Sequence, residues 1–390
     1  MFTKRKKAIL LAATAFSVTS TLAFAQDAQT QAELDALRAR VEALETSSAG
    51  PANGDFRLGN TSLDVYGYIK ADFFYDFDFE QGDTAFVNVI GEPSTATSGT
   101  FGSTVRQSRI GLRTSTPSAL GDIGGQLELD LFASDDAAEL RLRHANITIG
   151  DNWLIGQYWT NFQPLDTYPT SVEFNGPVGI AFARQPQIRY TNSFGANTEF
   201  SVSLEENVSG SNSNDPVLTA AAEYNDGTYV ARISGLYGKA ETSDGATEVD
   251  QWGVTLSGSV RPWEGGLFQV NYVTGQAIGP YLIGLGNAIV NGQANDVDGY
   301  TIEFRQDLGE KWNVGIAYGK EDYDLATNSF SDGTGSLNFT ELETIHVNAF
   351  YQATDNLTLS AEYIYGERND APTGRTFDGS RVQLAAPLNF

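Results

Sequence analysis

Residues 63–77 read LDVYGYIKADFFYDF, and the period of this stretch decides the fold class. The odd-numbered positions are apolar or Gly throughout. The even-numbered positions carry the charged residues Asp64, Lys70, Asp72 and Asp76. Successive side chains of a β-strand point to opposite faces. Alternation over more residues than most globular strands contain predicts a transmembrane strand, with one face toward lipid and the other toward a lumen.

The same alternation continues to the end of the chain and predicts sixteen strands. The predicted strands are residues 61–79, 103–114, 122–132, 139–149, 152–160, 183–192, 197–205, 217–224, 228–237, 248–260, 266–274, 297–306, 311–321, 340–352, 356–366 and 380–390. The pattern is weakest at 139–160, where the apolar parity shifts after Leu142. Such a shift indicates a β-bulge or a strand that faces an interface.

The connections between these strands alternate in length. Those after even-numbered strands are short, such as Gly150-Asp151. Those after odd-numbered strands are long, with 133–138 as the exception. The long connections are residues 80–102, 161–182, 206–216, 238–247, 275–296, 322–339 and 367–379. Short periplasmic turns and longer external loops are typical of outer-membrane barrels. We therefore predict an all-β fold, a 16-stranded antiparallel transmembrane β-barrel over residues 61–390.

The first 25 residues have the three parts of a cleavable signal peptide. Basic residues 4–7 precede the apolar stretch 8–18, and Ala23-Phe24-Ala25 offers a small-x-small cleavage site. An uncleaved anchor helix is the alternative, but the apolar stretch is shorter than the roughly 20 residues that span a bilayer. We expect residues 1–25 to be a signal peptide.

Residues 26–46 differ from the rest of the chain and predict a short α-helical coiled coil. Leu34, Leu37, Val41 and Leu44 follow a 3-4-3 spacing, the apolar seam of a heptad repeat. Opposite charges occupy the flanking heptad positions, which favours parallel helices in register. A single amphipathic helix lying on the barrel is the alternative, because two heptads are marginal alone. Residues 47–60, rich in Ser, Gly and Pro, form the expected linker.

Composition narrows the function classes. The chain has 24 Lys and Arg against 49 Asp and Glu, a formal net charge of −25. A nucleic-acid partner is excluded, because binding one needs a basic face that neutralises phosphates. Cys is absent, so no disulfide stabilises this exported chain. After the signal peptide no run of 18 apolar residues occurs, so we expect no transmembrane helix.

The last predicted strand ends on an aromatic residue, Phe390. Val382, Leu384, Ala386 and Leu388 share its face. This pattern resembles the C-terminal strand by which outer-membrane proteins are recognised for insertion. We therefore expect the barrel-assembly machinery to bind the chain through Phe390, and outer-membrane lipid and lipopolysaccharide to surround the barrel.

If the apolar faces meet lipid, the alternate positions face a water-filled lumen and are rich in arginine. The residues expected to line the pore are Arg109, Arg113, Arg141, Arg143, Arg189, Arg232, Arg305, Arg381 and Lys70. Lumen acids include Asp72, Glu128, Asp130, Glu303 and Glu362. Clustered guanidinium groups select anions, so we expect small anionic solutes. The alternative is that these charges only pair across strands and shape the wall.

The connection 161–182 is too long for a turn and is rich in Pro, Gly and aromatic residues. Its place after the fifth strand matches the loop that folds into the pore of sixteen-stranded porins, and its prolines would stiffen it. A mobile external loop is the alternative. The constriction residues that we expect are Phe162, Asp166, Tyr168, Glu173 and Asn175.

Three motifs resemble one family. They are WLIGQYWTNFQPLDTYPTSVEFNGPVGIAFARQPQIRYT at 153–191, Arg106-Gln107-Ser108-Arg109 and Leu140-Arg141-Leu142-Arg143-His144-Ala145. The chain is similar in these motifs to the DcaP-like porins of Gram-negative bacteria, which also carry an N-terminal periplasmic coiled coil. The resemblance implies a homotrimer that passes small organic anions, dicarboxylates among them. It places Arg109, Arg141, Arg143, Arg184 and Arg189 in the lumen near the constriction.

Other functions find weaker support. The two histidines, His144 and His346, lie in no catalytic motif, so we expect no enzyme and no cofactor. Asp76, Asp78 and Glu80 are weak candidates for a Ca²⁺ site, and a solvated acidic rim is the simpler interpretation. A structural or adhesin barrel, anchored by its coiled coil and without significant conduction, is the alternative to a channel.

Overall fold

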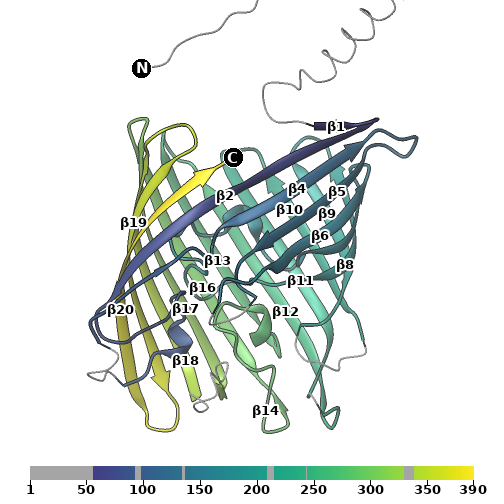
Figure 1. Ribbon diagram of the computed structural model, residues 1–390. Coiled ribbons are helices and arrows are strands. Elements are labelled where there is room, and N and C mark those ends of the chain that lie inside the picture. Colours follow the sequence, from purple (N-terminus) through teal and green to yellow (C-terminus); the bar gives the residue numbers. More distant parts are fainter. Residues whose placement is uncertain (1–55, 93–97, 134–136, 209–214, 243, 329–337) are drawn as a thin grey trace, which may run out of the picture. The chain divides into compact units, whose positions relative to one another are not determined.

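The computed structural model describes residues 56–92, 98–133, 137–208, 215–242, 244–328 and 338–390. The predicted signal peptide, the coiled-coil segment and most of the linker lie outside these residues. The described residues form a closed, antiparallel β-barrel (Figure 1). No helix in this described part of the chain has the length and apolarity needed to cross a membrane.

Sixteen strands make up the wall, and every predicted strand is present. They are β2 (Thr61–Asp76), β4 (Arg109–Thr116), β5 (Ile123–Asp130), β6 (Arg141–Ile149), β7 (Trp153–Trp159), β8 (Arg184–Phe194), β9 (Thr198–Glu205), β10 (Val217–Asn225), β11 (Tyr229–Glu241), β12 (Glu248–Val260), β13 (Gly266–Gln276), β16 (Asp296–Leu308), β17 (Trp312–Asn328), β18 (Asn338–Gln352), β19 (Thr358–Asp370) and β20 (Arg375–Asn389). Each pairs with its sequence neighbour. The predicted fold class is confirmed for the barrel.

Short elements complete the fold. The strand β3 (Thr100–Thr104) pairs with β2 and forms the outer part of the second wall strand, while β1 (Phe56–Leu58) extends the edge of β2. The strands β14 (Ile289–Val290) and β15 (Gln293–Ala294) form a hairpin. Three one-turn 3₁₀ helices lie in the described parts of the long connections: η1 (Val87–Val89), η2 (Leu165–Thr167) and η3 (Gly279–Tyr281).

The barrel closes where the last strand meets the first. The register of β20 on β2 runs from Tyr68 opposite Asn389 to Asp76 opposite Arg381. Beyond it, the backbones of Phe390 and Gly67 exchange two hydrogen bonds of 3.1 Å. Closure leaves no unpaired sheet edge, which is the condition for a sheet to span lipid.

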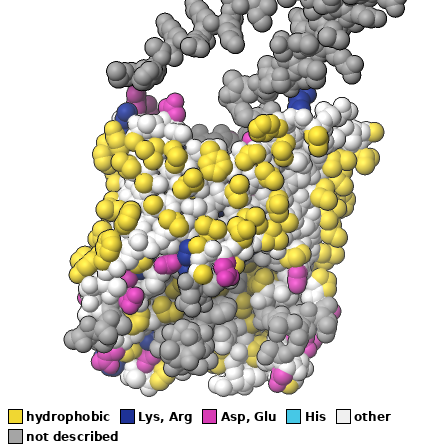
Figure 2. Space-filling view, viewed as in Figure 1, with side chains coloured by type: hydrophobic (Ala, Val, Ile, Leu, Met, Phe, Trp, Pro, Cys, Tyr) yellow, Lys and Arg dark blue, Asp and Glu magenta, His cyan; other side chains and the backbone are white. Residues whose placement is uncertain are grey.

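The two faces of each strand follow the predicted parity. In β2, Ile69, Phe73 and Tyr75 are exposed outward, and Lys70 and Asp72 are buried inside. Figure 2 shows the outcome on one face of the barrel, a broad hydrophobic band with most acidic side chains below it, toward one end. Lipid in place of water stabilises such a surface.

Several strands run further than the sequence pattern indicates. The predicted connection 367–379 is reduced to residues 371–374, because β19 and β20 stay paired as far as Asp370 opposite Arg375. The predicted connections after β11 and β17 shorten in the same way. These extensions carry charged side chains on the outer face, so apolar alternation does not reveal them.

A β-bulge in β6 explains the parity shift after Leu142. Leu142 lies opposite Leu129 and His144 lies opposite Glu128, so Arg143 is the extra residue. Leu142 stays exposed on the outer face, whereas Arg143 and His144 are both buried inside. The predicted bulge is confirmed, and it turns two consecutive polar side chains toward the lumen.

Part of the lumen is filled by a packed apolar core. The described residues of connections 77–99, 160–183 and 277–295 meet inside the barrel, and each connection contributes buried residues: Val87, Ile90, Phe162, Val178, Ile180, Ile278, Tyr281, Leu282 and Ile283. They pack on wall residues such as Val273, Phe339 and Leu342. The expectation of a lumen filled only with water is therefore corrected, because two predicted external loops are apolar enough to fold inward.

Candidate functional site

The inward loop, residues 160–183, joins β7 to β8 and follows the inner wall around most of the barrel. It contacts one wall strand after another through backbone hydrogen bonds. The contacts along its first half are Asn161 N–H to Glu205 on β9 at 2.9 Å, the Ser234 hydroxyl on β11 to Phe162 O at 2.7 Å, and Asn271 Nδ2 on β13 to Thr167 O at 2.9 Å. A loop held at each step is a fixed part of the lumen.

Buried glutamates on the wall anchor the second half of this loop. Thr170 N–H donates to Glu303 on β16 at 3.1 Å, and Val172 and Glu173 N–H groups donate to Glu362 on β19 at 2.9 and 2.6 Å. Gly179 N–H donates to Glu321 on β17 at 2.9 Å. Carboxylates that accept backbone N–H groups make strong, charge-assisted hydrogen bonds.

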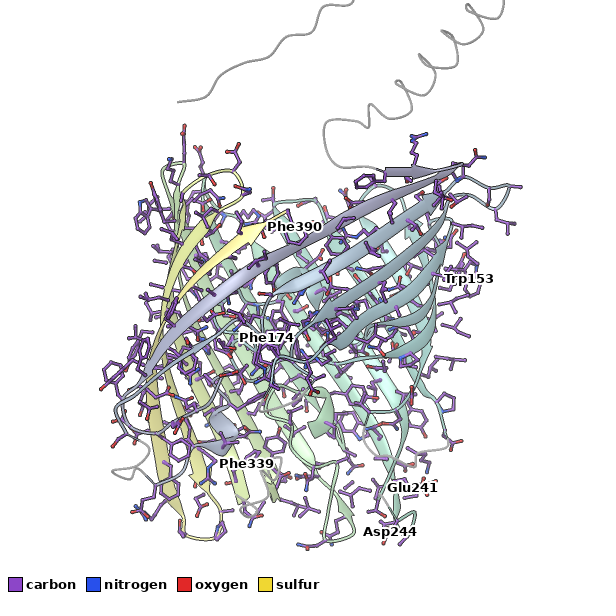
Figure 3. All side chains as sticks on the ribbon, in the orientation of Figure 1. Trp153, Phe174, Glu241, Asp244, Phe339 and Phe390 are labelled. Carbon is purple, nitrogen blue, oxygen red and sulfur yellow. The ribbon has the colours of Figure 1, made fainter. Side chains whose placement is uncertain are left out.

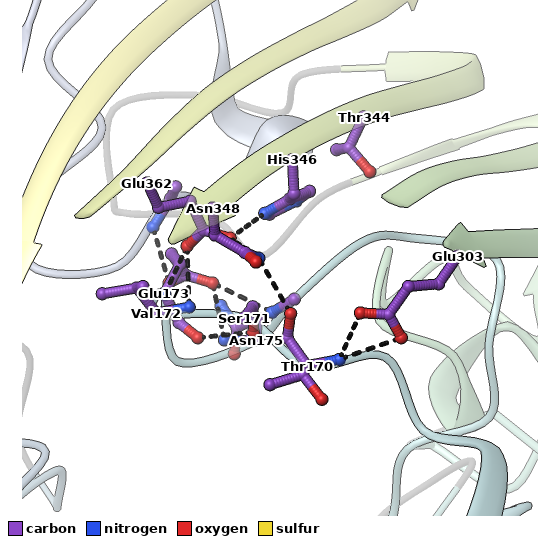
Figure 4. Close-up of polar contacts among 12 residues, drawn as sticks. Thr170, Ser171, Val172, Glu173, Asn175, Glu303, Thr344, His346, Asn348 and Glu362 are labelled. Carbon is purple, nitrogen blue, oxygen red and sulfur yellow. Dashed lines mark hydrogen bonds and ion pairs between the residues drawn. The ribbon is translucent and has the colours of Figure 1, made fainter. Parts of the chain in front are cut away.

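Glu362 is the centre of one such network (Figure 4). Besides the two loop N–H groups, it contacts His346 Nδ1 at 3.2 Å and accepts a hydrogen bond from Asn348 Nδ2 at 3.1 Å. Asn348 Nδ2 also donates to Thr170 O at 2.9 Å, which links the wall to the loop a second time. The wall and the loop thus share their polar partners.

Glu173 holds the tip of the inward loop. Its carboxylate accepts N–H groups from Ala85 at 3.0 Å, Asn175 at 2.6 Å and Gly176 at 3.0 Å. Burial raises the pKa of Glu173, whereas His346 and the N–H groups of Asn175 and Ala85 act to lower it. Because Ala85 belongs to the connection 77–99, this carboxylate joins two of the three inward connections.

Arginines gather on the opposite wall and form the arginine cluster. Its members are Arg106, Arg109, Arg141, Arg143 and Arg184, contributed by the 105–108 segment, β4, β6 and β8. Three carboxylates face them: Asp83, Glu128 and Asp130. Five guanidinium groups against three carboxylates leave the cluster with a positive formal charge.

The ion pairs of the cluster fix its central arginines. Arg141 binds Asp130 side-on, with Nε at 2.9 Å and Nη2 at 2.6 Å. Arg143 donates from Nε to Glu128 at 2.7 Å and from Nη1 to Asp130 at 2.9 Å. The side chains of Arg141 and Arg143 differ in exposure, at 31% and 3%. Arg141 therefore offers its charge to solvent on the inner face, and Arg143 supports it from beneath.

Aromatic rings cover the guanidinium faces. Arg184 lies over the Trp159 ring at 4.8 Å, and Arg106 lies over Phe132 at 4.6 Å. The Phe174 ring, on the inward loop, lies near both Arg141 and Arg143. Figure 3 places Phe174 about midway along the barrel. Cation–π contacts of this kind hold a guanidinium group without using its N–H donors.

The structure divides the other predicted pore residues into two groups. Arg113, 56% exposed, Arg189 and Arg232 retain accessible surface. Arg232 pairs with Glu223 at 3.1 Å, and Arg189 donates to Trp159 O at 2.5 Å.

The second group lies buried beneath the inward connections. Arg381 pairs with Asp76 at 2.7 Å, Arg305 with Glu303 at 2.9 Å, and Lys70 with Asp72 at 3.0 Å. Lys70 also donates to Val172 O at 2.6 Å, which ties the inward loop to β2. These three cations offer no exposed charge to a solute.

The residues predicted for the constriction have different surroundings. Phe162 is fully buried in the apolar core, and Glu173 and Asn175 are buried within the loop. Tyr168 is half-buried and donates to Asn175 O at 2.6 Å. Asp166 is exposed and accepts a hydrogen bond from Asn225 at 2.8 Å. Among the five, Asp166 alone reaches solvent freely.

The weak Ca²⁺ candidates are not grouped. Asp76 forms an ion pair with Arg381, and Asp78 accepts a hydrogen bond of 2.9 Å from the Ser380 hydroxyl. Within the residues that the structure describes, no three His, Asp or Glu side chains are placed to share a metal ion.

Sequence reasoning missed Phe174, Phe132 and Arg106, which lie at the centre of the arginine cluster. Phe174 lies outside every predicted strand. Arg106 and Phe132 fall inside the predicted strands 103–114 and 122–132 but lie in connections of the structure, where alternation does not set the direction of a side chain. It also missed the apolar residues of 277–295. Their signal was available, because Ile278, Leu282 and Ile283 are out of place in a solvated external loop.

Comparisons with known proteins agree with this architecture. The model of the family described as DcaP outer membrane protein matches residues 29–390. The crystal structure of the outer membrane channel DcaP of Acinetobacter baumannii has a TM-score of 0.75 at 23% identity, covering 85% of this chain and 98% of that one. The anion-selective porin from Comamonas acidovorans has a TM-score of 0.60 at 14% identity, covering 85% and 100%.

A third solved structure is more distant. OmpF of Salmonella typhi, in complex with daunomycin, has a TM-score of 0.56 at 11% identity, covering 86% and 100% of the two chains. No curated protein sequence matches the chain. The fold is that of an outer membrane porin, and the family match spans nearly the whole sequence. The chain belongs to the DcaP outer membrane protein family.

Proposed function

We propose that this protein is an outer-membrane channel for small hydrophilic solutes with a preference for small organic anions, dicarboxylates among them. The observation that carries the proposal is the arginine cluster, in which five guanidinium groups meet three carboxylates on the inner wall and Arg141 keeps 31% of its side chain exposed. Confined guanidinium groups attract carboxylates more strongly than they would in bulk water.

The apolar core and the arginine cluster occupy different parts of the lumen, and this separation supports the same proposal. The apolar core lies against wall residues of β10, β11, β13, β16, β17, β18 and β20, and it packs against the inward loop. Arg113, which is exposed, and Arg109 and Arg141, which are partly exposed, lie on β4 and β6, away from that core. A solute path along this wall would carry anions past one arginine after another. The Comamonas relative is described as anion-selective, which agrees with this direction.

We further propose that the protein is a homotrimer, exported by residues 1–25 and carrying the coiled coil of 26–46 in the periplasm. A solved OmpT structure of Vibrio cholerae, which shares the fold, is described as a trimer form. The heptad charges of residues 33–45 favour parallel helices, as three chains with a common membrane orientation would require. Outer-membrane lipid and lipopolysaccharide would contact the hydrophobic band, and Phe390 would engage the barrel-assembly machinery.

Planar-bilayer recording of the purified protein tests the channel. We expect stepwise conductance increments that occur in threes, because three pores would insert together. Increments that occur singly would contradict the trimer and leave the channel standing. Absence of any conductance, from protein whose folding is verified by circular dichroism, would overturn the channel itself.

The packed core in the lumen favours one other function. A barrel whose lumen is partly filled by three connections could act as a structural or adhesin anchor without significant conduction. If the protein is such an anchor, we expect the same bilayer experiment to show no stepwise current after the protein has been added. Liposomes into which the folded protein has been reconstituted, and which do not swell in isotonic sugar or salt solutions, would support this second function.

A further inference from the structure

Phe174 stands apart from its neighbours on the inward loop. Across residues 172–180, all of which the structure describes, it is the one side chain that is not buried. The other eight residues pack against the wall or the apolar core. Phe174 is therefore a large aromatic side chain that stays partly open within an otherwise buried stretch of the loop, and it is available to contact a solute in the lumen.

The backbone on both sides fixes the place of this ring. Glu173 N–H donates to Glu362 at 2.6 Å, and Asn175 N–H donates to the Glu173 carboxylate at 2.6 Å. Gly176 N–H donates to the same carboxylate at 3.0 Å. Phe174 is thus held between anchored residues, so its ring position is set by the wall of the barrel.

The ring faces the arginine cluster. Its centroid lies 4.7 Å from that of Phe132, and the two rings form an aromatic clamp. The Arg141 guanidinium lies 5.4 Å from the Phe132 centroid and 5.5 Å from that of Phe174. Arg143 lies 5.8 Å from Phe174. The clamp therefore contacts the Arg141 guanidinium with one ring from the inward loop and one from the segment after β5, while Asp130 binds its N–H groups.

We propose that Phe174 is a specificity-determining residue, which together with Phe132 holds Arg141 in the orientation that recognises an anion. Asp130 takes up two N–H groups of Arg141, and a ring face takes up none. The clamp thus restrains the guanidinium plane and leaves its remaining donors to the solute. This inference rests on the proposed anion preference and adds the residue that sets it.

The variant Phe174→Leu separates this role from simple filling of space, because Leu is apolar but has no ring face. We expect the anion-to-cation permeability ratio, measured from the reversal potential in a KCl gradient, to fall about two- to five-fold. Unitary conductance should change far less. Phe174→Tyr, which keeps the ring, should have the same permeability ratio as the wild-type channel.

The control is Leu165→Ala, on the same loop and 37% exposed, without a contact to the arginine cluster among those that the structure gives. It should keep the original ratio. A Phe174→Leu channel with the original ratio would overturn the inference, while the anion preference would stand. A wild-type channel without anion preference would instead overturn the proposed function. Should Phe174→Leu fail to assemble, Phe132→Leu tests the clamp from the wall side, with the same two outcomes.

Discussion

Arg141 and Arg143 show how single residues acquire a role from local geometry. Alternation predicts that both face the lumen, and the structure places both there. Alternation does not predict the effect of the bulge at Arg143. The bulge turns His144 inward as well, and it brings Arg143 within reach of Glu128 and Asp130. The arrangement leaves Arg141 as the more exposed member of the pair.

The double variant Arg141→Ala, Arg143→Ala tests this pair. It leaves three guanidinium groups against three carboxylates, so the positive balance of the cluster disappears. We expect dicarboxylate uptake into liposomes to fall more than uptake of a neutral sugar of similar size. If uptake of both solutes fell equally, the two substitutions would have changed the shape of the pore and not the recognition of the dicarboxylate.

Glu173 is the residue on which the loop tip depends. In the variant Glu173→Gln, one of the two carboxylate oxygens becomes an NH₂ group that faces backbone N–H donors. We expect a loss of about 1–3 kcal/mol in the stability of the seated loop. Protection of the 173–176 amides from hydrogen exchange measures it, and Asp166→Asn, an exposed position on the same loop, serves as the control. Unchanged protection in Glu173→Gln would contradict the anchoring role.

At the scale of the element, the inward loop is fixed by close approach of backbones as well as by hydrogen bonds. Gly179 has a φ of +91°, and a Cβ atom there would collide with the carbonyl oxygens of Tyr300 and Lys320. A Cβ atom at Gly319 would likewise collide with the carbonyl oxygen of Val178. The loop therefore lies directly on β16 and β17, with no room for a side chain between them.

Gly179→Ala should displace the loop. The added methyl group meets backbone atoms that have no rotamer to move, and the left-handed φ adds strain of about 1–3 kcal/mol. We expect a larger and more variable unitary conductance, recorded in planar bilayers. Gly195→Ala, at an open turn where nothing lies within 4 Å, carries similar backbone strain without the collision. Identical conductance in both variants would show that the loop does not limit flow.

Sequence reasoning located this loop but not its partners. Length, proline content and order in the chain were sufficient to predict that residues 161–182 differ from the other connections. Which wall residues receive the loop depends on pairs far apart in sequence, such as Val172 with Glu362, and no local pattern encodes such a pair. For the same reason Phe162, predicted to lie at the constriction, lies in the apolar core instead.

At the scale of the whole molecule, the strands were the most predictable feature. Lipid imposes alternation on every strand, so the sixteen segments could be found from a period of two. Strand ends beyond the hydrophobic band could not, because lipid imposes no pattern there. The apolar core inside the barrel was also missed, since alternation describes the wall and says nothing of what fills it.

The coiled-coil segment leads to a prediction about assembly. Two heptads contribute little stability alone, so the walls of the barrels should hold the trimer together. We expect a variant without residues 27–45 to run as a heat-resistant trimer on gels, at the same temperature as the full chain to within about 5 °C. Dissociation of the shortened chain under conditions that preserve the full one would identify the coil as the main contact.

The reversal potential of the wild-type channel under a KCl gradient tests the central claim most directly, that the arginine cluster makes this barrel an anion-preferring pore. The cluster carries five guanidinium groups against three carboxylates, and its member Arg141 keeps 31% of its side chain exposed. We predict a reversal potential shifted toward the equilibrium value of chloride, and a smaller shift at high salt as the charges are screened. A reversal potential at zero, or on the potassium side, would contradict the account.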